Sequence, residues 1–149
     1  MQLNSKCSLA LHCLLLIAEF APGERVTSET LARSTGCNAV TIRNLTGVLK
    51  KAGILSIARG VGGASLARPA EDISLWDVYS AIDAAFPSPM IPVHPNPSAR
   101  CPVGKHISPI LDQAYQPVEE AVRLSMSRVS LAQLQAHYRE LEQQDTPTA

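Results

Sequence analysis

The glycine-rich stretch IARGVGGASLAR, residues 57–68, restricts the fold more than any other feature of the chain. Stretches of this kind either bind phosphate groups or form the turn of a β-hairpin. A P-loop ends in Gly-Lys-Ser/Thr and opens a helix, and here no lysine follows the glycines. A dinucleotide fingerprint needs a final glycine and a βαβ unit, and the sequence provides neither. The stretch therefore predicts a hairpin turn between strands at residues 54–58 and 64–67.

The apolar residues near the start recur with helical spacing up to Phe20, where a Pro-Gly pair follows. We interpret this segment as a buried amphipathic helix. A secretory signal peptide after Lys6 is the alternative, although His12 and Glu19 interrupt its apolar run. No run is long enough to span a bilayer. Four scattered cysteines without a CxxC pair favour a reducing compartment, so we expect a cytoplasmic protein without a membrane segment.

Two short helices should follow, joined by a tight turn that contains Gly36. Ser28 is expected to cap the first of them and Asn38 the second, which runs to about Ala52. Gly47 lies in the middle of the second helix and costs it about 1 kcal/mol relative to alanine. The sequence offers no reason for that glycine.

Three helices followed by a hairpin form a winged helix-turn-helix, with the hairpin as the wing. The outward face of the third helix is small and polar, so it can enter a major groove about 12 Å wide. Arg43 is expected to prefer guanine and Asn44 adenine, while Lys50 and backbone amides near Ser28 would contact phosphates. Arg59 at the wing tip suits a narrow minor groove, although a solvent-exposed arginine beside a turn is the alternative. The predicted DNA contacts are Ser28, Asn38, Ala39, Val40, Thr41, Arg43, Asn44, Lys50, Lys51 and Arg59.

The net charge of the 149 residues is zero, but the two halves differ. Residues 1–68 carry eight Lys or Arg against three Glu, whereas residues 69–149 carry five basic against ten acidic side chains. The basic half suits nucleic acid. We therefore divide the chain into a DNA-binding domain, residues 1–68, and a segment 69–149 with a linker helix, a proline-rich loop and dimerisation helices.

The second half begins with a capping box. Ser74 and Asp77 have the required spacing and predict a helix over residues 75–83. Six prolines between residues 87 and 102 then predict an extended loop, which we place at residues 87–105.

A long helix is expected after this loop. Ser108 can cap it with Pro109 at its first position, and Pro117 is expected to interrupt and kink it. Ser130 with Gln133 then predicts a final helix. A long helix at the edge of a small domain needs a partner for its second apolar side, which predicts a homodimer on a palindromic DNA site. The alternative is that the helix folds back on its own domain.

Cys101 lies between Arg100 and the pair Lys105-His106, just before a predicted helix start. Nearby positive charge and the helix dipole both favour the thiolate. We hypothesise a redox-responsive thiol that forms a disulfide across the dimer or reacts with an electrophile. The alternative is a packing residue.

Several segments together resemble the Rrf-type winged-helix transcriptional regulators of bacteria, the family of the iron–sulfur cluster regulator and the nitric-oxide-sensitive repressor. They are SKCSLALHCLLLIA, the helix pair up to LKKAGIL, the wing with its continuation RGVGGASLARPAEDISLWDVYSAID, and the Cys loop HPNPSARCPVGKHI, which is similar to the YwnA-like branch. The resemblance implies dimers paired through the long helix. It also implies a third helix in the major groove, at residues 38–44, and Arg59 in the minor groove.

Cluster-binding members of that family carry three cysteines in the loop, whereas this chain has Cys101 alone there. We therefore expect no iron–sulfur cluster and no other cofactor. His94 and His106 with Cys101 match no strong zinc spacing, so no metal site is predicted.

The sequence favours a DNA-binding regulator, a repressor, over two other classes. A winged-helix protein-interaction module remains the alternative. An enzyme built on Cys101 is not expected, because no general base accompanies that thiol in the sequence.

Overall fold

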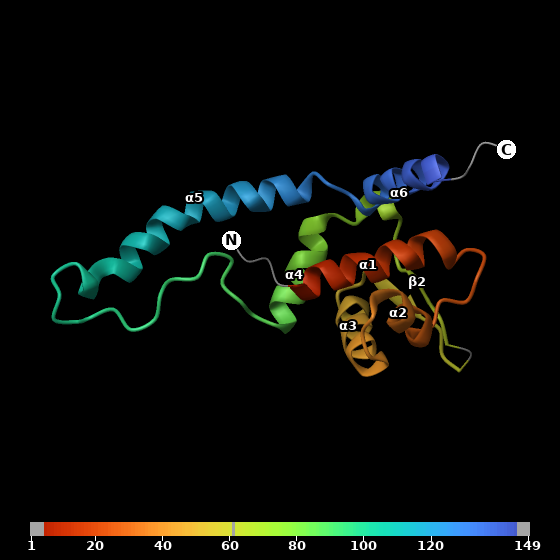
Figure 1. The fold of residues 1–149 in the computed structure, drawn as a ribbon, viewed down its shortest axis with the longest axis horizontal. Coiled ribbons are helices and arrows are strands. Elements are labelled where there is room, and N and C mark those ends of the chain that lie inside the picture. The colour runs from red at the N-terminus through yellow and green to blue at the C-terminus, as the bar shows by residue number, and fades with distance from the viewer. Residues whose placement is uncertain (1–4, 61, 146–149) are drawn as a thin grey trace.

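The structure is a computed structural model, in which residues 5–60 and 62–145 are described. Its elements in chain order are α1 (Ser5–Phe20), α2 (Ser28–Thr35), α3 (Ala39–Lys51), β1 (Leu55–Ile57), β2 (Ala64–Leu66), the 3₁₀ turn η1 (Ala70–Asp72), α4 (Leu75–Ala85), the 3₁₀ turn η2 (Gly104–His106), α5 (Ile107–Ser127) and α6 (Leu131–Asp145). Figure 1 shows a helical body, formed by α1–α4, α6 and the wing, from which α5 and the loop that precedes it project as an arm. The predicted class, mainly α-helical with a small β-hairpin, is confirmed.

The predicted helix-turn-helix is formed by α2 and α3. Thr27, not Ser28, caps α2, and its hydroxyl accepts a hydrogen bond from the N–H three residues on at 3.2 Å. Ser28 is instead the first helical residue, because the extended backbone that a cap needs lies at Thr27. Gly36 ends α2 in the left-handed conformation. Asn38 caps α3 as predicted, accepting from the N–H of Thr41 at 2.8 Å.

The wing follows α3 directly. Its strands β1 and β2 are antiparallel, with Ser56 opposite Ser65. The N–H of Ala64 also donates to the carbonyl of Val26 at 2.9 Å. This bond ties the wing to the segment between α1 and α2, so that wing, α2 and α3 hold one another in place.

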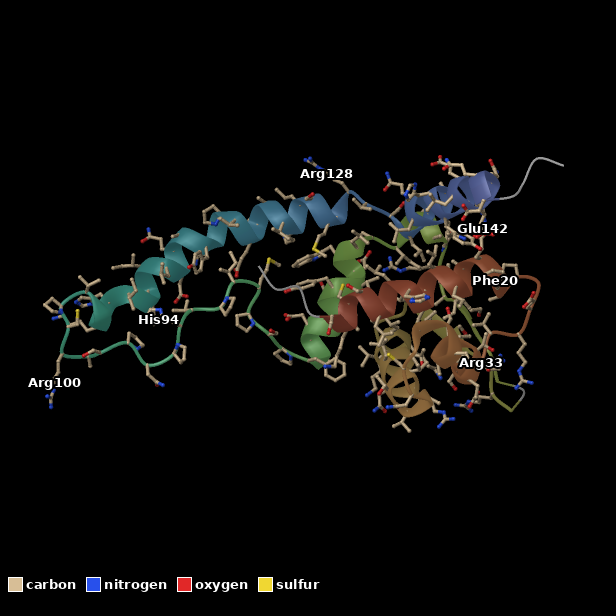
Figure 2. All side chains as sticks on the ribbon, viewed as in Figure 1. Phe20, Arg33, His94, Arg100, Arg128 and Glu142 are labelled. Atoms are coloured by element: carbon tan, nitrogen blue, oxygen red, sulfur yellow. The ribbon has the colours of Figure 1, made fainter. Side chains whose placement is uncertain are left out.

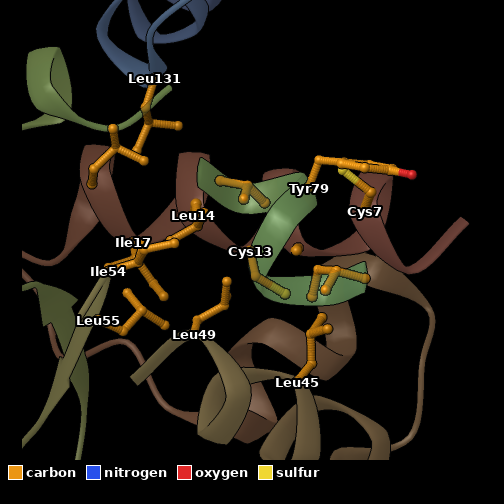
Figure 3. Packing of buried hydrophobic residues seen from close by; sticks show 14 of the residues in the cluster. Cys7, Cys13, Leu14, Ile17, Leu45, Leu49, Ile54, Leu55, Tyr79 and Leu131 are labelled. Atoms are coloured by element: carbon orange, nitrogen blue, oxygen red, sulfur yellow. The ribbon is translucent and has the colours of Figure 1, made fainter. Parts of the chain in front are cut away.

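The core lies where α1, α3 and α4 meet (Figure 3). Leu14 and Ile17 of α1 are fully buried, as are Leu49 of α3 and Ile82 of α4. Leu131 at the start of α6 closes the same core. Each such side chain contributes about 1.5–3 kcal/mol by leaving water, so α4 and the start of α6 are part of the body.

The linker helix α4 begins with the predicted capping box. The Ser74 hydroxyl accepts from the N–H of Asp77 at 3.1 Å, and the N–H of Ser74 donates to the Asp77 carboxylate at 2.8 Å. Ser130 and Gln133 exchange the corresponding bonds at the start of α6, at 2.8 and 3.3 Å. These two starts lie side by side, because the N–H of Leu131 donates to the carbonyl of Ile73 at 2.8 Å.

The predicted start of α5 at Ser108 was wrong. The turn η2 runs directly into Ile107, so no side chain caps the helix and Pro109 is its third residue. The helix α5 continues through Pro117, so the proline does not break it. A proline removes one N–H bond, and at this exposed position water can satisfy the carbonyl freed four residues earlier. Figure 1 shows a bowed but unbroken helix.

The last helix, α6, lies against α1. Glu19 of α1 accepts hydrogen bonds from Arg139 Nε at 2.8 Å and from Gln135 Nε2 at 3.1 Å. In Figure 1, α6 lies above α1, while α2 and α3 lie below it.

Among the described residues, the structure contains no helix with the length and apolar character needed to cross a membrane.

Candidate nucleic-acid interface and the Cys101 loop

One face of α3 is exposed and points away from the core. Its inward residues are Ile42, Leu45, Thr46 and Leu49, all buried. Five of the predicted contact residues within α3 are exposed: Val40, Arg43, Asn44, Lys50 and Lys51. Ala39 and Thr41 are half-buried, and the side-chain oxygen of Asn38 is engaged as the cap. Val40 stands out as an apolar side chain that is 62% exposed.

Arg43, for which a base-reading role was predicted, forms an ion pair with an acidic residue of α2. Arg43 Nη2 donates to Glu29 Oε1 at 2.8 Å, and both side chains are well exposed. The pKa of Glu29 is lowered by a hydrogen bond from its own backbone N–H and then by Arg43. Arg43 can therefore reach a guanine only by opening or sharing this pair. The sequence analysis did not find Glu29, because the two residues are 14 positions apart.

A second basic residue, from the segment between α1 and α2, lies beside the wing and was not found from the sequence. Arg59 is exposed in the turn after β1, as predicted. Arg25 lies across the other end of that turn, since a Cβ on Gly62 would stand 2.9 Å from Arg25 Nη2. A Cβ on Gly63 would stand 3.2 Å from Arg25 Cγ, and both glycines have positive φ. Both positions favour glycine because their φ angles are positive and Arg25 packs against them.

Arg25 and Arg43 line the same hollow, of about 270 Å³, between α2, α3 and the wing. The first residues of α2, including Ser28, form another of its walls. The hollow therefore brings together two guanidinium groups, the Glu29 carboxylate that pairs with Arg43, and the amide end of a helix. The predicted phosphate contact at Ser28 lies where such a group would find partners.

The two lysines of α3 lie in its last turn, where positive charge also favours the helix dipole. Both are exposed. By helical spacing Lys51 lies on the same side as Val40 and Asn44, whereas Lys50 lies nearer the flank.

Cys101 lies at the end of the arm, remote from α3. Figure 2 places His94 and Arg100 in the loop beneath the far end of α5, whereas Arg33 lies on α2 in the body. Cys101 is exposed. Backbone N–H groups of Gly104 and then Val103 hydrogen bond its sulfur and lower the pKa of the thiol. The predicted direction is confirmed, but the cause is the backbone of η2 and not the neighbouring charges.

The other cysteines have the opposite environment. Burial raises the pKa of Cys7, and it raises the pKa of Cys13 to about 11. Both lie in the core beneath α4, so they stay protonated at neutral pH and pack as small apolar groups, as predicted.

Known proteins share this arrangement of helix-turn-helix, wing and long helix. The chain matches the model of the Rrf2 family, described as iron-dependent transcriptional regulators, over residues 3–137. The chain belongs to the Rrf2 family. The resemblance drawn from the sequence is thereby confirmed, and the chain is a transcriptional regulator of the helix-turn-helix type.

Three similar proteins each cover at least 91% of this chain. The "Putative HTH-type transcriptional regulator YwnA" of Bacillus subtilis (strain 168) is 38% identical over 135 residues, 91% of this chain and 98% of that protein. A transcriptional regulator structure from Lactobacillus plantarum has a TM-score of 0.70 at 27% identity and covers 95% of this chain and 98% of its own. The structure of T. potens IscR has a TM-score of 0.69 at 17% identity, over 100% of this chain and 94% of its own. This last likeness shows the fold alone.

The residues of this Rrf2 chain do not fit a cluster held by three thiolates. Cys7 and Cys13 are buried in the core, while Cys101 lies on the arm. Across residues 5–60 and 62–145, no three His, Cys, Asp or Glu side chains stand together as a metal-ligand group.

Proposed function

We propose that this chain is a sequence-specific DNA-binding repressor that acts in the cytoplasm as a homodimer on a palindromic site. The observation that carries the proposal is an apolar stripe on α5 that the described residues leave exposed. It is supported by the polar face of α3 beside an exposed, arginine-bearing wing.

The stripe has the spacing of a helix pair. None of the residues of α5, all of them described, is buried. Ile110, Val118 and Leu124 are 54%, 45% and 44% exposed. Exposed positions repeat at intervals of four, three, four and three residues, which is the spacing of a coiled-coil seam: Ile110, Ala114, Pro117, Ala121 and Leu124. A second copy of the same stripe covers it through a two-fold axis.

A two-fold axis through α5 also doubles the DNA-binding surface. Each protomer contributes one α3 to a major groove and one wing to the neighbouring minor groove. Half-sites then recur about 34 Å apart or at a multiple of that distance. Lys50, Lys51 and the α2 amide end neutralise phosphates, while Thr41, Arg43 and Asn44 discriminate bases.

The dimer on DNA excludes the transcription machinery from the occupied promoter, and Cys101 provides the signal for release. Its lowered pKa and exposed position make it the thiol that reacts first with peroxide or an electrophile. In this scheme the protein carries no iron–sulfur cluster and no other cofactor.

The DNA proposal is tested with duplexes selected by the wild-type protein from a randomised pool. Fluorescence anisotropy on a selected duplex and on its shuffled control measures specificity, and sedimentation measures assembly. We expect a dimer that prefers the selected duplex and weakens steeply with salt. Asn44→Ala should remove the preference, whereas Lys50→Ala should weaken both duplexes equally. If no duplex is enriched, the protein-interaction module is the better description.

The thiol proposal has its own test. Iodoacetamide at neutral pH should label Cys101 far faster than Cys13, and Cys101→Ser should remove the fast label. Peroxide should release the wild-type dimer from its duplex and leave Cys101→Ser bound. Equal release of both proteins would assign the signal elsewhere.

A further inference from the structure

The outward stripe of α3 contains one position without a side chain. Helical spacing aligns Val40, Asn44, Gly47 and Lys51 on the side opposite the buried residues of this helix. Val40 and Lys51 mark the two ends of the stripe and are exposed. Gly47 therefore leaves a gap in the middle of the surface that faces outward.

Nothing within the described chain explains this glycine. A Cβ built on Gly47 meets no heavy atom of the described residues within 4 Å, so no neighbour requires the space. Its backbone is not among the described positions with positive φ, so no unusual conformation requires glycine either. The helix is continuous from Ala39 to Lys51, which excludes a break at this point. Glycine still lowers the stability of a helix interior relative to alanine.

We propose that Gly47 is a positioning residue for DNA: its bare backbone lets the middle of α3 lie against the major groove without a side chain between them. This inference rests on the proposed function. Asn44 and Val40, one and two turns before the gap, then reach the base edges. The apolar Val40 suits a thymine methyl group and Asn44 suits adenine. A methyl group added at Gly47 would hold the whole helix away from both contacts.

The inference predicts effects of opposite sign on stability and on binding. Gly47→Ala should raise the melting temperature by roughly 3 °C, because alanine is the better helix former and has free space. The same variant should bind the selected duplex at least about tenfold more weakly. Gly47→Leu should weaken it further, since the larger side chain extends deeper. Affinity for the shuffled duplex should change far less, because phosphate contacts tolerate a shallower position.

Gly23→Ala is the matched control. Gly23 also has free space around a Cβ and an ordinary backbone, but it lies between α1 and α2, outside the stripe. This variant should leave the preference for the selected duplex unchanged. Circular dichroism and thermal melting of every variant separate a folding effect from a binding effect.

Two results overturn the inference. Gly47→Ala with wild-type or tighter affinity for the selected duplex shows that the gap is not used, and a lower melting temperature shows that the glycine has an internal reason. Failure of the proposed function looks different, because then the wild-type protein selects no duplex and Asn44→Ala changes nothing. A wild-type protein that binds specifically, together with a sensitive Asn44 and an insensitive Gly47, removes this inference alone.

Discussion

The body and the arm of this regulator are stabilised in different ways. In the body, α1, α3 and α4 each bury side chains in one shared core. In the arm, the 21 residues of α5 bury none, although the helix is longer than any of those three. An isolated helix of this kind is marginal in water, so its stability has to come from packing. The core of the body is formed within one chain, whereas α5 leaves its apolar stripe exposed among the described residues.

The cysteines show the same contrast in chemical terms. Burial in the body raises the pKa of Cys13 to about 11, while backbone N–H groups at the end of the arm lower the pKa of Cys101. A body that is fully packed leaves no room for a reactive thiol. At the end of the arm the Cys101 thiol is exposed, so a reagent in solution can reach it.

The largest expected effect is the loss of a core side chain. Leu49→Ala removes a fully buried group between α1 and α3 and should lower the free energy of unfolding by about 3 kcal/mol. Urea denaturation followed by circular dichroism measures this difference. Val103→Ala is the control in the arm, where the side chain is 63% exposed, and it should cost less than about 0.5 kcal/mol. Similar losses for both variants would contradict the division into body and arm.

A charge on the α5 stripe should have the next largest effect. Leu124→Glu places a carboxylate in the proposed seam and should weaken self-association at least about tenfold, without unfolding the body. Analytical ultracentrifugation over a range of concentrations measures the association. Gln116→Glu adds the same charge on the other side of α5 and should change it little. A wild-type protein that stays monomeric would mean that α5 is covered by something other than a second copy.

Local rules predicted much of the body. Asn38 and the Ser74–Asp77 box were found from the sequence because a cap involves residues only three positions apart. The wing was found because the stretch lacks the lysine of a P-loop and the final glycine of a dinucleotide fingerprint. The residues that were missed, Glu29 and Arg25, interact with distant parts of the chain. Their partners depend on how α2 is placed against α3 and the wing, which periodicity does not reveal.

The same local rules did not predict the structure of the arm. Ser108 has the right side chain for a cap, but η2 already supplies a helical turn ahead of it. Pro117 is unfavourable in a helix interior, but on an exposed face water can bind the carbonyl that loses its N–H partner. The structure places every predicted contact at the start of α2, on α3 with its cap, or in the wing. Whether they touch DNA stays a prediction for the binding experiment.

The third prediction compares a cap in the body with a serine in the arm. Thr27→Ala removes the hydroxyl that accepts from the N–H of Thr30 in the first turn of α2 and should cost about 1 kcal/mol. Ser28→Ala and Ser108→Ala should each cost no more than a few tenths of that, because neither residue is a cap in the structure. Thermal and urea unfolding of the three variants checks the order. A larger loss at Ser28 than at Thr27 would restore the original sequence prediction.

The smallest effect is expected from pH, at the contact that holds α6 on α1. The hydrogen bond from Arg139 is the main reason why the pKa of Glu19 is lowered. A carboxyl with a lowered pKa in the folded state stabilises the protein above its unfolded pKa of about 4.3, and this contribution is lost as the pH falls through the folded value. Because Arg139 is well exposed, the contact is weak, and Glu19→Gln should lower the melting temperature at pH 7 by no more than about 3 °C. The difference between wild type and variant should shrink as the pH falls through the folded pKa of Glu19, because the protonated side chain is neutral like glutamine. Melting curves from pH 7 to pH 3 measure it, and a difference that grows on acidification would show that Glu19 does not act through its charge.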